Sequence, residues 1–259
     1  MKIKNLIKAC KAGAWHLAND MINRGESALS ASRKGKTALM YACRRGATDV
    51  IARLIERGAD VNARTRRGKT PLHYACAGGS VAACDLLLAR GADAAATDVL
   101  GRGALHFACR SGSIPLVEKL LAGGADLHAR DARGRSPLHH AAAKGHWPLI
   151  ELLTARGADL AEADTLGYTA LHHAARKGRR MLVELLLAHG VAPDTPAQDG
   201  RTPLILACLH GHRKTAAILL AHGANPGTCD ASGISAAALA SANGKATLRR
   251  LFGAGGTTP

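Results

Sequence analysis

Residues 66–79 read RRGKTPLHYACAGG, and related strings recur along the 259-residue chain at one fixed spacing. The first glycine of each string lies 33 residues after the first glycine of the string before it. These glycines are Gly35, Gly68, Gly101, Gly134, Gly167, Gly200 and Gly233. A strict period of this length indicates an array of structural repeats, in which each unit packs against its neighbours instead of forming a core of its own.

Each repeat contains two further glycine positions that divide it into short helices. Eleven residues after the first glycine comes a second one, such as Gly79, which is expected to close a first helix, and a third, such as Gly91, ends a second helix. Between these glycines the apolar residues fall at helical spacing, as Leu182, Leu185 and Leu186 do. Each repeat is therefore expected to be a turn, a helix, a short loop, a second helix and an extended loop.

Three of the strings carry a more specific pattern. They read TPLHYACAGG at 70–79, SPLHHAAAKGH at 136–146 and TPLILACLHGH at 202–212. These strings resemble the T-P-L-H-x-A-A-x-x-G-H signature of ankyrin repeats, and the 33-residue period is the ankyrin period too. The resemblance implies a mainly α fold, an α-solenoid with short β-hairpin or loop fingers, which is curved so that a concave face binds partners.

The resemblance covers nearly the whole chain, because Leu6 and Gly13 align by the same offset and add a degenerate first repeat. We expect a single domain over residues 1–253 and a flexible tail over residues 254–259. The expected repeats are 2–34, 35–67, 68–100, 101–133, 134–166, 167–199, 200–232 and 233–253. The last repeat places Arg249 on its outer flank, which suits a terminal repeat that no neighbour covers.

The tripeptide GKT, at 35–37 and 68–70, also occurs in the phosphate-binding loops of nucleotide enzymes. Such a loop needs a second glycine five positions earlier, because backbone N–H groups can cradle a phosphate only where the chain folds tightly around it. Ser30 and Ala63 occupy those positions, so we expect no nucleotide site. The resemblance instead places each threonine at the start of a first helix, where its hydroxyl accepts from free backbone N–H groups.

Four histidines occupy the histidine position of the signature, and the resemblance implies that they hydrogen-bond to the backbone of adjacent loops. They are His73, His106, His139 and His172. His140 and His173 replace an aromatic residue of the earlier repeats and are expected to pack in the core. No H-E-x-x-H motif or paired C-x-x-C occurs, so we expect no metal site and no cofactor.

Seven cysteines, an odd number, lie scattered in a chain without a secretory signal, which favours a reducing compartment over a disulfide framework. Five share one repeat position: Cys10, Cys43, Cys76, Cys109 and Cys208. Equivalent positions on packed helices lie about 8 to 10 Å apart, whereas a disulfide needs Cα atoms within roughly 7 Å. We expect small core residues. A Cys-His catalytic pair is the alternative, but no pair stands out, and we expect a protein that is not an enzyme.

No run of about 18 apolar residues occurs, so no membrane span is expected. The opening MKIKNLIKACKAG is basic, but Asp20 follows soon and the segment fits the first repeat, so we interpret it as structure instead of a transit peptide. The expected location is intracellular, in the cytoplasm or alternatively the nucleus. The chain is expected to act as a monomer or as a subunit of a larger complex.

The charge of the chain is unevenly distributed. It carries 35 Lys and Arg against 19 Asp and Glu, a net charge of +16. By resemblance to ankyrin proteins, the finger tips and the exits of the first helices line the concave face. In the seven glycine-headed repeats sixteen such positions are basic and only Asp199 is acidic, while the rest of the chain has 19 basic and 18 acidic residues. The predicted partner-binding residues are Arg33, Lys34, Lys36, Arg44, Arg45, Arg66, Arg67, Lys69, Arg102, Arg110, Arg133, Arg135, Lys144, Tyr168, Arg176, Lys177 and Arg201.

This pattern favours a non-enzymatic interaction module or scaffold that binds an acidic protein or protein tail, Glu/Asp-rich or phosphorylated. Arginine forks suit both carboxylates and phosphates. The alternative is a nucleic acid or ribonucleoprotein held by its phosphates, although an aromatic content of 3% offers few stacking platforms. A third hypothesis is a structural spacer in an assembly, with Trp15 and Trp147 as anchors or as covers of the repeat edges. No small-molecule substrate is expected.

Overall fold

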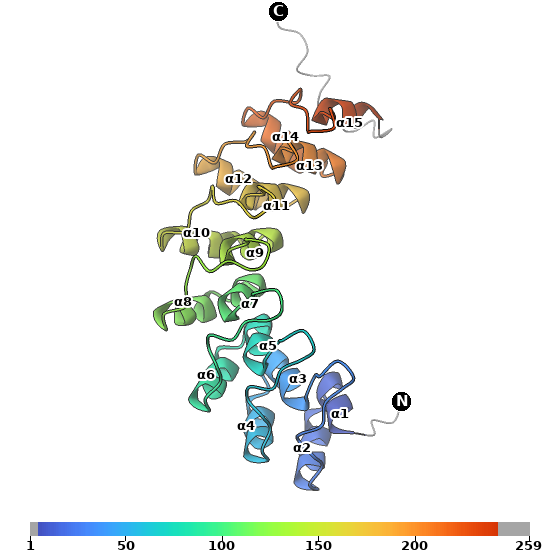
Figure 1. Cartoon of the computed structure of the whole chain (residues 1–259), viewed down its shortest axis with the longest axis vertical. Helices are drawn as coiled ribbons and strands as arrows, with labels where there is room; N and C mark the ends of the chain where they lie inside the picture. The colour runs from blue at the N-terminus through green and yellow to red at the C-terminus, as the bar shows by residue number, and fades with distance from the viewer. Residues whose placement is uncertain (1–4, 243–259) are drawn as a thin grey trace, which may run out of the picture. The chain divides into compact units, whose positions relative to one another are not determined.

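The computed structural model describes residues 5–242, which contain fifteen α-helices and confirm the mainly α fold (Figure 1). The helices are α1 (Leu6–Ala12), α2 (Trp15–Asn23), α3 (Ala38–Arg45), α4 (Thr48–Glu56), α5 (Pro71–Gly78), α6 (Val81–Ala89), α7 (Ala104–Ser111), α8 (Ile114–Ala122), α9 (Pro137–Lys144), α10 (Trp147–Ala155), α11 (Ala170–Arg176), α12 (Arg180–Ala188), α13 (Pro203–Leu209), α14 (Arg213–Ala221) and α15 (Ala236–Ala242). The predicted end of the last repeat, Arg249 and the predicted tail over 254–259 lie outside the described residues.

The chain divides into two compact units, Met1–Ala132 and Arg133–Pro259. The single domain over residues 1–253 stays a prediction. The division falls one residue before the expected boundary between repeats 101–133 and 134–166. The first unit contains α1 to α8 and the second α9 to α15. In each unit the helices form successive pairs, and the first helices of the pairs pack beside one another.

The expected apolar spacing places one side of each helix in the core. In the first unit the fully buried leucines include Leu39, Leu54, Leu87 and Leu116. The second unit has an equivalent set, which includes Leu153, Leu171, Leu186 and Leu204. Burial of one such side chain contributes about 1.5 to 3 kcal/mol, so the repeated leucines stabilise each unit although every helix is short.

The glycines have the role expected at helix ends and turns. Gly79 ends α5 with a φ of 73°, and its N–H donates to the carbonyl of Cys76 at 3.1 Å. Gly68, with a φ of 71°, begins a repeat, and a Cβ atom there would come within 3.1 Å of the Val99 backbone nitrogen. The left-handed conformation therefore favours glycine at both positions, and the close approach of the Val99 backbone adds a second reason at Gly68.

The starts of the first helices confirm the predicted caps. The hydroxyl of Thr37 accepts from the N–H of Met40 at 3.3 Å, and that of Thr202 accepts from Ile205 at 3.3 Å. Gly103 has no side chain to cap α7, and only its N–H donates to His106 Nδ1, at 3.3 Å. This repeat therefore begins its first helix with a weaker cap than its neighbours.

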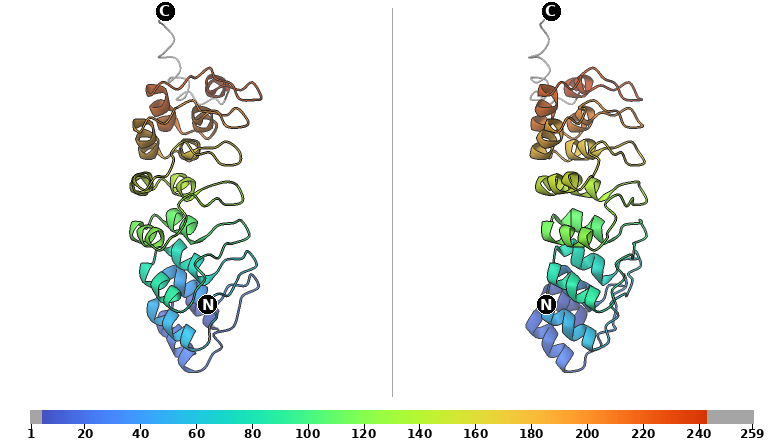
Figure 2. Two further views of the ribbon diagram at one scale, coloured as in Figure 1. Left: turned by 60° about the vertical axis from the view of Figure 1, so that its left-hand side comes forward. Right: turned by 90° about the vertical axis from the view of Figure 1, so that its left-hand side faces the viewer.

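The extended loops between the repeats form fingers that leave the helices on one side of each unit (Figure 2). Neighbouring fingers of the first unit are joined by backbone hydrogen bonds, from Val99 N to Arg67 O at 3.1 Å and from Ala132 N to Leu100 O at 2.8 Å. Within residues 5–242 their β structure is limited to two isolated bridges, one of which pairs Ala31 with Thr37. Two of the fingers thus contain a single bridge each, and the other described fingers are loops.

Candidate functional site

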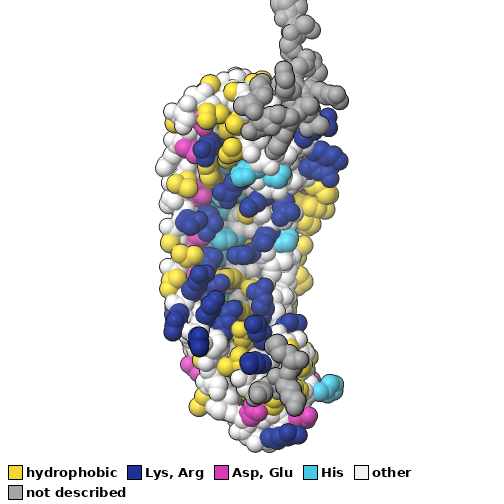
Figure 3. All heavy atoms as spheres, turned by 90° about the vertical axis from the view of Figure 1, so that its right-hand side faces the viewer, with side chains coloured by type: hydrophobic (Ala, Val, Ile, Leu, Met, Phe, Trp, Pro, Cys, Tyr) yellow, Lys and Arg dark blue, Asp and Glu magenta, His cyan; other side chains and the backbone are white. Residues whose placement is uncertain are grey.

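The predicted contact residues are divided between the two units. Ten of the basic residues belong to the first unit: Arg33, Lys34, Lys36, Arg44, Arg45, Arg66, Arg67, Lys69, Arg102 and Arg110. The second unit has Arg133, Arg135, Lys144, Arg176, Lys177 and Arg201, together with Tyr168. Figure 3 faces the side of each unit that carries the first helices, and dark blue Lys and Arg side chains clearly outnumber magenta Asp and Glu there.

Two adjoining depressions lie among the basic residues of the first unit. One, of about 490 Å³, is lined by Lys11, Lys36, Tyr41, Arg44, Arg45 and Tyr74. The other, of about 360 Å³, is lined by Lys34, Lys36, Thr65, Arg66, Arg67, Lys69 and Tyr74. Lys36 and Tyr74 belong to both linings, and neither lining contains a carboxylate. We call these two depressions together the basic cleft.

Lys11 belongs to the basic cleft but was missed by the sequence analysis. It stands 33 residues before Arg44, at the same repeat position in the degenerate first repeat. The predicted contact positions belong to the seven glycine-headed repeats, and Lys11 lies in the repeat before them. The signal that identifies Lys11 is therefore the period itself, extended by one unit.

Aromatic rings lie beneath the lysines of the basic cleft. The ammonium of Lys36 lies 5.5 Å from the ring centre of Tyr41 and 5.6 Å from that of Tyr74. Lys69 lies 4.9 Å above the ring of Phe107 in the same manner. A cation over an aromatic face is attracted by the ring quadrupole. The rings thus hold these ammonium groups in place without neutralising them.

Lys69 shows the electrostatic consequence of crowding like charges. Burial is the largest cause of its lowered pKa, and the neighbouring guanidinium of Arg102 lowers it further. Arg110 and Arg67 act in the same direction, while Asp98 partly opposes them. The charged form of Lys69 is therefore less stable than that of a lysine free in water, and an anion placed nearby would stabilise it.

Two of the predicted contact residues of this unit are held by the fold itself. Arg102 makes an ion pair with Asp98, whose Oδ2 lies 3.0 Å from Nε and 2.5 Å from the terminal nitrogen. Burial raises the pKa of Asp98, but hydrogen bonds from Arg102 and the backbone outweigh it and leave the pKa lowered. Arg45 donates to the carbonyl of Lys11 at 3.2 Å. Both arginines are thus less available than their repeat positions suggested.

In contrast, three basic residues at the first two finger tips project freely. Lys34, Arg66 and Arg67 are exposed, and no side-chain ion pair or hydrogen bond involves them within the described part of the chain. Only their backbones are held, since Arg66 N donates to Lys34 O at 3.3 Å. Their charges remain open to a partner.

In the second unit, two of the predicted contact residues, Arg201 and Tyr168, meet carboxylates. Arg201 lies 3.5 Å from Asp199 and 3.5 Å from Asp230. Tyr168 is only 7% exposed, and its hydroxyl donates to Asp199 at 3.1 Å. The sequence placed Tyr168 among the contact residues, but the structure buries it between loops of the fold, because its ring packs against His172 and His173.

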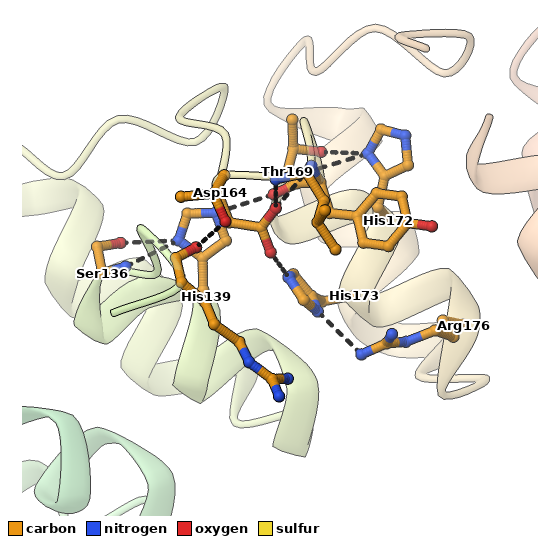
Figure 4. A network of polar contacts seen from close by, with 11 residues as sticks. Ser136, His139, Asp164, Thr169, His172, His173 and Arg176 are labelled. Atoms are coloured by element: carbon orange, nitrogen blue, oxygen red, sulfur yellow. Dashed lines mark hydrogen bonds and ion pairs between the residues drawn. The ribbon is translucent and has the colours of Figure 1, made fainter. Parts of the chain in front are cut away.

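A buried polar network lies at the centre of this unit (Figure 4). Asp164 accepts from the backbone of Leu166 at 2.9 Å and of Tyr168 at 3.0 Å, and its second oxygen lies 3.0 Å from His173 Nε2. Burial raises the pKa of Asp164, but the bond from His173 and the two backbone bonds outweigh it and lower the pKa to about 2. His173 therefore does more than the predicted packing.

The signature histidines of this unit confirm their expected role. His139 Nε2 lies 3.1 Å from the carbonyl of Tyr168, and His172 Nε2 lies 3.1 Å from that of Arg201. Their Nδ1 atoms face Ser136 and Thr169 at the helix starts. Burial lowers the pKa of both histidines to about 4, so they are neutral near pH 7. These side chains join adjacent loops and hold the repeats together.

The cysteines do not form a reactive group. All seven are free, and only Cys229 is exposed. Burial raises the pKa of Cys10 and of Cys208 to about 11, so both remain thiols near neutral pH. The sequence did not anticipate that Cys76 Sγ lies 3.6 Å from Cys84 Sγ, because Cys84 is on a second helix outside the shared repeat position.

Across residues 5–242, no group of three or more His, Cys, Asp or Glu is arranged to hold a metal ion. The helices within this range are also too short or too polar to span a membrane.

Comparisons with known proteins agree with the repeat geometry. The sequence matches the family described as ankyrin repeats (3 copies) over residues 6–98, 105–197 and 181–257, and that described as ankyrin repeats (many copies) over 79–121. No curated protein sequence matches the chain. The crystal structure of the human ASB11 ankyrin repeat domain is similar, with a TM-score of 0.74 and 31% identity over 86% of this chain and 100% of that one. The chain therefore belongs to the ankyrin-repeat family, whose members are generally interaction modules for proteins.

Proposed function

We propose that the chain is a non-enzymatic module that holds an acidic segment of another protein in the basic cleft of its first unit. One observation carries the proposal: two adjoining depressions are lined by lysines, arginines and tyrosines, with no carboxylate in either lining. In the second unit, by comparison, Arg201 has two carboxylates of the protein within 3.5 Å. The cleft lacks this internal compensation.

The energetics of the free protein favour an acidic ligand. Charges on successive repeats lie about 8 to 10 Å apart, near one Debye length at physiological salt, so their repulsion is only partly screened. Burial is the largest cause of the lowered pKa of Lys69, and repulsion from Arg102, Arg110 and Arg67 lowers it further. Carboxylates placed between the cations would relieve it, and arginine forks would bind them in pairs.

A depression elsewhere on the same unit shows that the basic cleft is not simply typical surface. It has a volume of about 440 Å³ and lies between α2 and α4, where Arg53 and Arg57 are accompanied by Asp49 and Glu56. The net charge of that lining is zero. The basic cleft thus carries an excess of positive charge that the depression between α2 and α4 does not have.

The test is the affinity of a fluorescently labelled peptide of eight glutamates, measured by anisotropy at 50 and 150 mM NaCl. Glutamate substitutions at Lys34, Arg66 and Arg67 should weaken binding at least about tenfold, since each of three rim charges contributes roughly 0.5 to 1 kcal/mol. The matched control is glutamate at Arg24, Arg57 and Arg90, exposed arginines that follow the second helices. This control has the same net charge and should lose less than about twofold.

Equal losses in the two triple variants would show attraction by net charge alone and would refute a specific cleft. Competition by an unstructured RNA separates the nucleic-acid alternative. Tyr74 and Phe107 are buried beneath lysines, so neither offers an open face for stacking, and we expect RNA to compete only weakly. Displacement of the peptide by RNA below about 10 µM at physiological salt would favour a phosphate backbone as the ligand instead.

The proposed location is the cytoplasm or the nucleus. All seven cysteines are free, and the close thiols of Cys76 and Cys84 are not joined. Thiols persist in this state where glutathione and thioredoxin keep them reduced. Immunofluorescence of the full chain in cells checks the proposal, and an exclusively extracellular signal would refute it.

A further inference from the structure

The third finger tip of the first unit departs from the first two in a way that the proposed function does not explain. The two residues before the first glycine are Arg66 and Arg67 at the second tip, but Val99 and Leu100 at the third. Val99 is 63% exposed and Leu100 37% exposed. A pair of adjacent apolar side chains therefore stands in solvent at a position that is strongly basic in the preceding repeats.

The apolar pair directly adjoins the basic tip. The N–H of Val99 donates to the carbonyl of Arg67 at 3.1 Å, so the two tips lie against each other through their backbones. On its other side Leu100 accepts from Ala132 at 2.8 Å. Packing of the unit does not need the apolar side chains, because these hydrogen bonds use backbone atoms that any residue supplies.

Resting on the proposed function, we infer that the partner segment is bipartite: an acidic stretch in the basic cleft continues into apolar residues that cover Val99 and Leu100. The continuity of the two surfaces supports one occupant for both. Charge complementarity with Arg66 and Arg67 favours acidic residues in the part of the segment that lies in the cleft. Burial of the exposed apolar area of Val99 and Leu100 stabilises the binding of its apolar residues.

The spacing of the tips sets the spacing within the segment. Successive repeats lie about 8 to 10 Å apart, and an extended peptide advances about 3.3 Å per residue. An acidic residue at the second tip and an apolar residue at the third are thus separated by about three positions. The partner motif consists of an acidic run, two spacer residues and an apolar pair. The acidic run lies at either the N-terminal or the C-terminal end of the motif.

Three labelled peptides test the inference by anisotropy. The first has six glutamates, two glycines and two leucines; the second reverses that order; the third has two serines in place of the leucines. One of the two leucine peptides should bind about five- to tenfold more tightly than the serine peptide, as expected for partial burial of two apolar side chains. This gain should persist at 300 mM NaCl, where the acidic contribution weakens.

The variant with Val99→Ser and Leu100→Ser should lose the gain and keep the affinity for the serine peptide. Leu166→Ser is the matched control, because Leu166 is 56% exposed at the equivalent tip position in the second unit and should leave the gain intact. Melting curves followed by circular dichroism verify that both variants fold.

The outcomes separate the two proposals. Binding of the serine peptide without any gain from leucine, in either order, would overturn the inference and leave the proposed function standing. A gain that survives Val99→Ser and Leu100→Ser would also overturn it, because the leucines would then contact another surface. Failure of all three peptides to bind would instead refute the proposed function. Capture by phosphatidylserine vesicles with no gain among the peptides would overturn the bipartite peptide in favour of a lipid surface.

Discussion

The first two fingers of the first unit and the first finger of the second unit use the same repeat position differently. Three residues before the first glycine, the first unit has Ser32 and Thr65 in its early fingers, whereas the second has Asp164. The hydroxyls of Ser32 and Thr65 accept from the backbone N–H of Lys36 and Lys69, each at 3.0 Å. Asp164 makes the same kind of backbone bond to Tyr168 and brings a negative charge as well.

The comparison shows how a repeat can keep its geometry while it changes its electrostatics. A hydroxyl and a carboxylate both satisfy the turn, but only the carboxylate neutralises a nearby cation. Asp98 illustrates the second case within the first unit, where it pairs with Arg102 four residues later. The lysines that follow Ser32 and Thr65 have no such partner there, so their charge remains available to a ligand.

The largest expected effect comes from removal of the carboxylate in the second unit. Asp164→Ala leaves the N–H groups of Leu166 and Tyr168 and the ring of His173 without their acceptor. We expect the free energy of unfolding to fall by roughly 3 to 5 kcal/mol, measured by urea denaturation. The matched change in the first unit, Thr65→Ala, removes one backbone acceptor and should cost about 1 kcal/mol. Equal losses would contradict the contrast between the units.

Lowering the pH from 7.5 to 5 should weaken the second unit next most strongly. His172 has a folded-state pKa of about 4, below the ordinary value of 6.5, so the unfolded chain takes up the proton first. Stability is full above pH 6.5 and falls toward pH 4, by about 2 kcal/mol at pH 5 for this histidine. The contribution of Asp164 remains, since its pKa of about 2 means that it is lost only below pH 3.8.

Urea denaturation at the two pH values measures this loss. His172→Gln removes one of the titrating groups, so the difference between pH 7.5 and pH 5 should shrink by about 2 kcal/mol in that variant. An unfolding free energy that does not change between pH 7.5 and pH 5 would show that the buried histidines do not control the pH response.

A smaller effect should follow from placing an aspartate in the second finger of the first unit. Thr65→Asp places a carboxylate four residues before Lys69, in the arrangement that Asp98 and Arg102 already show. We expect the affinity for the eight-glutamate peptide to fall about fivefold, because one cation of the cleft gains an internal partner. Thr65→Asn keeps the backbone acceptor without the charge and is the control. If the asparagine variant loses as much, the charge is not responsible.

The smallest effect concerns the weak cap in the first unit. Gly103→Thr should raise the free energy of unfolding by about 0.5 to 1 kcal/mol, through a capping hydroxyl and a less flexible unfolded chain. Space permits it, because a Cβ atom at Gly103 meets only the carbonyl of Ala96, at 3.8 Å. Gly103→Ala makes the unfolded chain less flexible but adds no capping hydroxyl. The difference in melting temperature between the two variants therefore gives the contribution of the hydroxyl. A lower melting temperature for the threonine variant would contradict the expectation.

Much of the fold could be predicted because the geometry of each repeat depends on residues that are close together in the sequence. The 33-residue period, the glycines at helix ends and the caps at Thr37 and Thr202 depend on neighbours within a few residues. The bonds of His139 and His172 followed from the family resemblance. The division after Ala132 was not predicted, since no change in the period marks it.

The candidate site was predicted less completely. Register alone placed Arg102, Arg45 and Tyr168 among the contact residues, but the structure shows them engaged with Asp98, Lys11 and Asp199. It also adds Lys11 and the aromatic rings beneath the lysines. Asp98, Lys11 and the aromatic rings lie outside the contact positions that were predicted, and the register does not show which side chains will contact one another.

The sequence by itself determined that this chain is an array of ankyrin repeats and that its excess positive charge falls at one set of repeat positions. Only the tertiary structure decided which of those charges are neutralised. The physical reason is that a period fixes where each backbone position lies, whereas the neutralisation of a cation depends on whether a carboxylate or a hydroxyl stands within a few ångströms of it. In the first two fingers it is a hydroxyl, and the charge of Lys36 and Lys69 is left for a partner.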